Sequence, residues 1–140
     1  MSGRFFLDTN IFVYSFDQSA PAKARVAAQL IREALTTKKG VISYQVVQEF
    51  FNVALRRFSQ PMRGAEAEQY LGTVLHQMLS VHSSTALFAE ALHFHGQRSL
   101  SWYDSLILGA AVQANCNVLF SEDFQHGQKF GSLQIRNPFL

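Results

Sequence analysis

The sequence is poor in cysteine and proline and carries little excess charge. Its 140 residues include one cysteine, Cys116, and three prolines. A lone cysteine forms no internal disulfide, so we expect a buried thiol in an apolar helical stretch and a reducing, cytoplasmic setting. Twelve Lys and Arg against ten Asp and Glu leave a net charge of +2, too small to indicate nucleic-acid binding by itself.

Long apolar runs are absent as well. No segment reaches the roughly 18 uninterrupted apolar residues that a membrane span needs. The first apolar stretch contains Asp8 and lacks the basic start and cleavage site of a signal peptide, so we expect neither a signal peptide nor a membrane protein. With 48% apolar residues and 13 phenylalanines, the composition is typical of a compact globular protein, and we expect one domain over residues 1–140.

Short apolar strands alternate with helical patterns along the chain. The expected strands are Arg4–Leu7, 40–44, a short one near Val81, 117–120, and 133–137 as a last edge strand. A short turn follows the first strand, and the expected helices cover about 21–37, 44–58, 63–78, 85–95 (ended by Gly96) and 102–115. This alternation predicts a three-layer α/β/α sandwich with a central parallel sheet of about four to five strands.

Four acidic residues are expected at one edge of that sheet. Asp8 interrupts the apolar run "FFLDTNIFVYSF", where an ionised carboxylate is costly unless something compensates it. It ends the first strand, and Asp123 follows the strand at 117–120. Glu49 lies early in the helix after the second strand, and Asp104 lies in the first turn of the buried helix. Because parallel strands end at a common edge, these acids should converge there.

Carboxylates forced together raise one another's pKa unless a cation neutralises them. An all-oxygen ligand set is typical of Mg²⁺ or Mn²⁺, and the absence of cysteine and histidine from the cluster argues against zinc. A cation held this way binds phosphate oxygens and orients a water, so phosphodiester hydrolysis is the predicted reaction. Thr9, Asn10 and Ser121 are small polar neighbours able to position the carboxylates or donate to a phosphate.

Each acid also has a simpler interpretation. Asp8 could cap the turn after its strand. Asp104 fits a capping box with the serine three residues before it and would complement the helix dipole. Glu49 lies opposite the apolar stripe of its helix, where a solvated glutamate would also sit. Asp123 competes with the adjacent Glu122, to which we assign no role.

Four segments together resemble the PIN-domain proteins, and especially the VapC toxins of bacterial toxin–antitoxin pairs. They are "FLDTNIFVY", "SYQVVQEFFNV", "LSWYDSLILGAA", and "LFSEDFQHG" with the terminal "IRNPFL". They occur in order and span essentially the whole chain. The resemblance implies a PIN-like fold and a Mg²⁺- or Mn²⁺-dependent endoribonuclease whose acids are Asp8, Glu49, Asp104 and Asp123. It further implies a homodimer and a cognate antitoxin that inserts a peptide segment into the active-site groove.

Our sequence-based hypothesis is a ribonuclease that cleaves RNA by metal-activated water, leaving a 5′-phosphate and a 3′-hydroxyl. Asp8, Asp104 and Asp123 would hold one or two ions, and Glu49 would complete the shell or orient the water. Arg56 and Arg57 could line an RNA path or belong to solvated surface. Trp102 could stack on a base or pack in the core, and His126 could touch RNA.

Three other protein classes also fit part of the pattern. A catalytically silent PIN-like module that binds RNA or protein is disfavoured because all four acids are retained. A signalling receiver domain normally has two adjacent acids after its first strand and a lysine after its last rim strand, and "LDTN" and "LFSED" provide neither. A haloacid-type phosphatase needs a second aspartate at the position of Asn10.

Overall fold

Six strands form one mostly parallel sheet in the order β3-β2-β1-β4-β6-β5. The computed structural model describes residues 3–140, so the first two residues of the predicted domain lie outside it. In this range β5 alone runs antiparallel to its neighbour. The strands are β1 (Arg4–Leu7), β2 (Gly40–Ser43), β3 (Leu79–Val81), β4 (Cys116–Phe120), β5 (Lys129–Phe130) and β6 (Leu133–Arg136).

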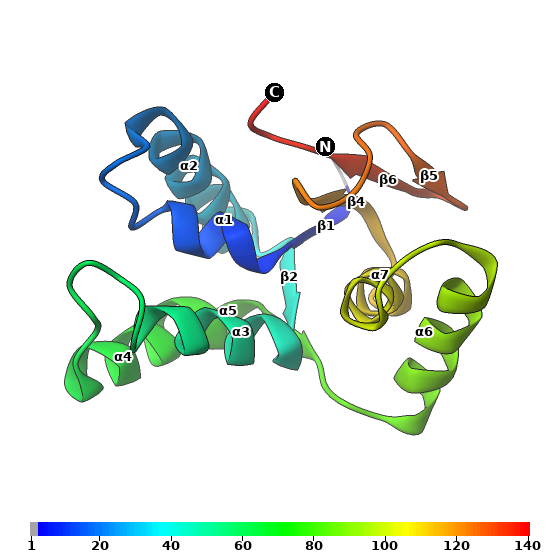
Figure 1. The fold of residues 1–140 in the computed structure, drawn as a ribbon, viewed down its shortest axis with the longest axis horizontal. Coiled ribbons are helices and arrows are strands. Elements are labelled where there is room, and N and C mark those ends of the chain that lie inside the picture. The colour runs from blue at the N-terminus through cyan, green and yellow to red at the C-terminus, as the bar shows by residue number, and fades with distance from the viewer. Residues whose placement is uncertain (1–2) are drawn as a thin grey trace.

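Helices cover both faces of the sheet. They are α1 (Thr9–Tyr14), α2 (Pro21–Thr37), α3 (Tyr44–Ala54), α4 (Gly64–Tyr70), the π-helical turn η1 (Leu71–Leu75), α5 (His76–Met78), α6 (Thr85–Gln97) and α7 (Trp102–Gln113). Figure 1 shows α1 and α2 on one side of the central strands and α6 and α7 on the other. Within residues 3–140 no helix combines the length and the apolar character needed to cross a membrane.

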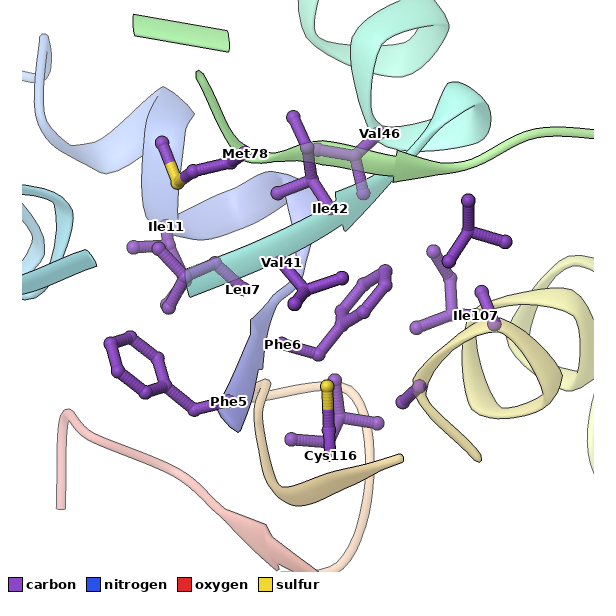
Figure 2. Packing of buried hydrophobic residues seen from close by; sticks show 14 of the residues in the cluster. Phe5, Phe6, Leu7, Ile11, Val41, Ile42, Val46, Met78, Ile107 and Cys116 are labelled. Carbon is purple, nitrogen blue, oxygen red and sulfur yellow. The ribbon is translucent and has the colours of Figure 1, made fainter. Parts of the chain in front are cut away.

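Strand β1 lies in the middle of the hydrophobic core. Its side chains alternate between the two faces of the sheet, as the strand repeat requires. Figure 2 shows Phe5 and Leu7 on one side of β1 and Phe6 on the other, directed toward Ile107 of α7. Phe6 and Leu7 are fully buried, which ties the strand to the helical layers on both faces. The end of β1, where Asp8 follows, is therefore rigidly placed.

The predicted three-layer α/β/α class is confirmed, with a sheet slightly larger than expected. Strand Arg4–Leu7 and helix Pro21–Thr37 have the predicted bounds. The turn expected after the first strand is wrong, because Thr9–Tyr14 forms helix α1. The helix has only six residues, and its last four, Ile11–Tyr14, are all apolar or aromatic, so no helical repeat can be recognised.

Three further boundaries differ from the prediction. Helix α6 runs through Gly96 to Gln97, since that glycine is exposed and needs no special conformation. Helix α3 ends at Ala54 rather than at Phe58, and α7 ends at Gln113 before Asn115, whose φ of 58° is left-handed.

The C-terminal region also differs from the prediction. Strand β6 is not an edge strand, because it pairs with β4 on one side and with β5 on the other. Strand β5 has two residues, too few for a sequence pattern, and a turn with Gly131 at a φ of 62° joins it to β6. Cys116 is buried as predicted, but it begins β4 instead of lying in a helix.

Gly40 permits the close approach of β2 to α2, which gives a test of this packing. A Cβ at position 40 would lie 2.2 Å from Ala34 Cβ and 2.9 Å from Ala34 Cα, so the helix would have to move. We expect Gly40→Ala to lower the free energy of unfolding by about 1–3 kcal/mol in urea denaturation. Gly96→Ala, where a Cβ meets no atom within 4 Å, is the control and should be neutral or stabilising. Equal stability of both variants would contradict the packing described.

Candidate active site

Four carboxylates from distant parts of the chain line one cavity of about 320 Å³. Asp8 follows β1, Glu49 lies on α3, Asp104 lies in the first turn of α7, and Asp123 lies in the loop after β4. Strands β1, β2 and β4 are neighbours in the parallel sheet, so their ends meet at one edge. The structure thus brings together the four acids that the sequence analysis selected.

Asp8 is the most buried of the four, with 4% of its surface exposed. One carboxylate oxygen accepts a hydrogen bond of 2.7 Å from the backbone N–H of Thr9, which caps α1. The other accepts a 2.7 Å hydrogen bond from the Ser121 hydroxyl. Burial raises the pKa of Asp8 to about 7, although these two hydrogen bonds lower it and the carboxylates of Asp123 and Glu49 add to the rise. Asp8 is therefore both a helix cap and a member of the cavity wall.

Glu49 is held by donors from two other positions. The Thr9 hydroxyl donates to its Oε1 over 2.5 Å, and the Gln45 amide donates to its Oε2 over 3.1 Å. Gln45 Nε2 also donates to the backbone carbonyl of Tyr103, over 3.2 Å, beside Asp104. These contacts connect α1, α3 and the start of α7 through a single carboxylate and a single amide.

Gln45 is a site residue that the sequence analysis missed. Its side chain is buried and lines the cavity. Its Nε2 faces two acceptors, the Glu49 carboxylate and the Tyr103 carbonyl, so a flipped amide would put oxygen against oxygen. The buried Oε1 then has no hydrogen-bond partner. A polar residue one turn before Glu49 was the available signal, but an exposed surface glutamine gives the same pattern.

Asp104 and Asp123 complete the acidic wall. Burial, and secondarily the charge of Glu49, raises the pKa of Asp104, while the Ser101 hydroxyl that caps α7 lowers it. Burial also raises the pKa of Asp123, with repulsion from Asp104 next in importance. The amide of Asn10 donates to Asp123 Oδ2 over 3.4 Å. Ser121 accepts from the Asp123 backbone N–H while donating to Asp8, so it links the two acids.

Glu122 does not line the cavity, unlike its neighbour Asp123. It accepts a 2.5 Å hydrogen bond from the Tyr14 hydroxyl and forms an ion pair of 3.3 Å with Lys23. Lys23 also lies over the Tyr14 ring, 4.5 Å from its centroid. Glu122 thereby anchors the loop that carries Asp123 to α1 and α2.

The other residues considered from sequence lie outside the cavity lining. Trp102 is half-buried and packs against the core, with its ring 6.4 Å from that of Phe88. The Nδ1 of exposed His126 accepts a hydrogen bond from the Asn137 N–H. The core interpretation of Trp102 is the one that the structure supports.

The cavity lining is chemically suited to Mg²⁺ or Mn²⁺. Its charged groups are carboxylates, and in residues 3–140 none of these four pairs with a lysine or arginine. Over the same residues, no group of three or more His, Cys, Asp or Glu side chains is arranged to hold a metal ion as it stands. Mg²⁺ usually keeps several waters and takes only one or two carboxylates directly, so a hydrated ion fits this donor set. Direct ligation by Asp8, Asp104 and Asp123 stays a prediction.

Comparison with known proteins agrees with this architecture. The family model of the PIN domain matches residues 5–129. No curated protein sequence matches the chain.

Solved structures of similar fold come from several bacteria. They include a toxin–antitoxin complex from Klebsiella pneumoniae, with 17% identity, a TM-score of 0.67, and coverage of 95% of this chain and 96% of that one. The VapC20 sarcin–ricin-loop-cleaving toxin of Mycobacterium tuberculosis is 19% identical, with a TM-score of 0.58 and coverage of 85% of this chain and 91% of that one. VapBC2 of Rickettsia felis, bound to promoter DNA, is 16% identical, with a TM-score of 0.62 and coverage of 94% of this chain and 96% of that one. At these identities the likeness establishes the fold.

The raised pKa of Asp8 predicts how stability depends on pH. Its folded-state pKa is about 7 and its ordinary value is 3.8, so the folded protein binds this proton more tightly than the unfolded chain does. The resulting stabilisation is complete below about pH 4 and is lost as the pH rises to about 7. In metal-free buffer, Asp8→Asn should therefore lose less stability than the wild type across that window, by on the order of a few kcal/mol. Urea denaturation at a series of pH values measures this.

The control for this prediction is Glu33→Gln, which removes an exposed carboxylate from α2. Its stability should follow the wild-type pH curve. Parallel curves for the wild type and Asp8→Asn would mean that Asp8 does not titrate in this range.

Proposed function

This chain belongs to the PIN domain family, and from that premise we propose that it is an endoribonuclease dependent on Mg²⁺ or Mn²⁺. The observation that carries the proposal is the convergence of Asp8, Glu49, Asp104 and Asp123 on one cavity without a neutralising protein cation among residues 3–140. Such a cavity attracts a divalent ion and, through it, a phosphate. When bound there, the ion supplies charge neutralisation at the phosphate and acidifies a water molecule.

The four acids have distinct tasks in this proposal. Asp8, Asp104 and Asp123 hold the ion. Both oxygens of Glu49 already accept hydrogen bonds, from Thr9 and Gln45, so its carboxylate has a fixed orientation. It is suited to completing the ion's shell or to orienting the attacking water and accepting its proton.

The proposed reaction needs no side-chain nucleophile. Water attacks the phosphorus, the bond to the 3′ oxygen breaks, and the products carry a 5′-phosphate and a 3′-hydroxyl. No histidine or lysine of residues 3–140 lines the cavity, so the usual side chains for activating the 2′-hydroxyl are missing from it. The ends of the products therefore distinguish this route from one that passes through a cyclic phosphate.

We also propose that the protein is the toxin of a VapBC-type pair and that it forms a homodimer. The motifs of the sequence support this, and so do the similar folds of a Klebsiella pneumoniae toxin–antitoxin complex and of Rickettsia felis VapBC2. A cognate antitoxin would then be its protein partner. Its active-site groove is the place where such a partner would block access of RNA.

Incubation with total RNA and Mg²⁺ or Mn²⁺ tests the nuclease proposal. We expect the wild type to cleave RNA, with activity abolished by EDTA and restored by the ion. Asp8→Asn and Asp104→Asn should each lower the rate by at least about a hundredfold, because each removes a carboxylate from the ion's site. Cleavage is followed by gel electrophoresis, and the product ends by their need for phosphatase or kinase treatment before labelling.

Glu33→Gln is the acidic control, since Glu33 is exposed on α2 and lies outside the cavity lining. It should keep far more activity than the two aspartate variants. Expression of the wild type alone should arrest growth, whereas Asp104→Asn should not. Equal cleavage by all variants would refute the mechanism, and binding of RNA without any cleavage would favour the silent PIN-like module.

Gln45 provides a second prediction about the same site. Gln45→Met keeps the side-chain length but removes the amide that holds Glu49 and the Tyr103 carbonyl. Loss of a group that orients an ion's ligand typically lowers activity by about 10–100-fold, and we expect kcat to fall with little change in KM. Gln48→Met, on the exposed side of the same helix, is the control and should resemble the wild type. Equal kcat for both variants would show that Gln45 does not position Glu49.

A further inference from the structure

A second hollow, of about 610 Å³, continues from the carboxylate cavity. Val13 of α1 and Val53 of α3 line both spaces, so the two share a boundary. The second hollow extends to Phe16, beyond the end of α1, and to Arg57, beyond the end of α3. A strand of RNA with a phosphate at the carboxylates has a continuous path into it.

The walls of this groove follow from the topology. Helices α1 and α3 begin directly after β1 and β2, which are parallel neighbours, so both helices start at the carboxylate edge. Along one wall Asn10 is followed by Val13 at helical spacing, and along the other Glu49 is followed by Val53. Four residues of helix advance about 6 Å. The second hollow thus lies about one to two turns from the acids.

Aromatic rings form part of the hollow's wall. Phe16 is 39% exposed, although its ring packs against three other aromatic rings. The centroid of the Phe16 ring lies 5.2 Å from that of Phe58, 5.3 Å from that of Tyr70 and 5.9 Å from that of Phe50. Phe50 is fully buried and holds the group in place. An exposed aromatic ring with fixed neighbours is the kind of platform on which an unpaired base stacks.

Within the part of the chain that the structure describes, the polar groups of the hollow offer unpartnered hydrogen-bond donors and acceptors to a ligand. The side chains of Arg57, Gln18 and Gln60 line it without a hydrogen-bond or ion-pair partner within residues 3–140. Its two acids are already engaged. Asp17 accepts from the backbone and the hydroxyl of Ser19, and Glu66 accepts from the Arg63 N–H.

We propose that this hollow binds an unpaired nucleobase of the RNA, next to the phosphate held at the carboxylates. The inference rests on the proposed function for the identity of the ligand. The Phe16 ring stacks on the base, and Arg57 donates hydrogen bonds to its edge. The substrate is accordingly single-stranded at this position, since a base paired in a duplex cannot enter.

Binding measured with Ca²⁺ in place of Mg²⁺ keeps a divalent ion between the carboxylates and the phosphate, and it tests the subsite by affinity instead of by turnover. The probes are a fluorescein-labelled single-stranded RNA and an abasic oligonucleotide of the same length, both followed by fluorescence anisotropy. We expect Phe16→Leu and Arg57→Gln each to weaken RNA binding about tenfold, the loss typical of one stacked base, and to leave abasic binding nearly unchanged. Arg57→Gln removes no side-chain hydrogen bond or ion pair within the described residues, so it tests the subsite even if Phe16→Leu disturbs folding.

The matched controls are Phe88→Leu, whose ring on α6 is also 39% exposed, and Arg56→Gln, which changes an exposed neighbour outside the hollow. Phe88→Leu should bind both probes like the wild type, and Arg56→Gln should affect both probes equally. If Phe16→Leu and Arg57→Gln match their controls, the subsite is refuted and the hollow is left for a protein partner. Loss of cleavage with base-dependent binding intact would refute the nuclease proposal alone.

Discussion

Four carboxylates lie in one small cavity against their mutual repulsion, and the local structure is arranged to hold them there. Burial and repulsion raise the pKa values of Asp8, Asp104 and Asp123, so ionising them together costs free energy. The protein does not offset this cost with its own cations, because the ion pair of Lys23 in residues 3–140 is made with Glu122 instead. The negative charge is left available to a ligand from solution.

Neutral donors hold the carboxylates, some from distant elements and one, Gln45, from the preceding turn of the same helix as Glu49. Ser121 connects Asp8 to the loop of Asp123, while Thr9 and Gln45 clamp Glu49. Hydroxyl and amide donors orient a carboxylate without neutralising it, unlike lysine or arginine. The same helices, α1 and α3, then extend the cavity into the second hollow, so ion binding and base binding would be arranged along one groove.

Much of the fold could be predicted because short apolar runs alternate with longer helical stretches along the chain. The strand at Arg4–Leu7 and the buried helix from Trp102 are examples, and the alternation of strands and helices indicated a parallel sheet. What could not be predicted was short or non-local. Helix α1 has six residues and β5 has two. The internal position of β6 depends on its hairpin with β5, which no sequence periodicity indicates.

The sequence by itself determined that Asp8, Glu49, Asp104 and Asp123 converge. Each of them lies near the end of a strand or near the start of a helix, and parallel pairing places those points at one edge of the sheet however the side chains pack. Tertiary structure alone decided the role of Gln45, the withdrawal of Glu122 from the cavity, and the groove between α1 and α3. These depend on which side chains of distant elements come within hydrogen-bonding or van der Waals distance. Such distances are set by the packing of whole helices against the sheet, so they cannot be predicted from local sequence patterns.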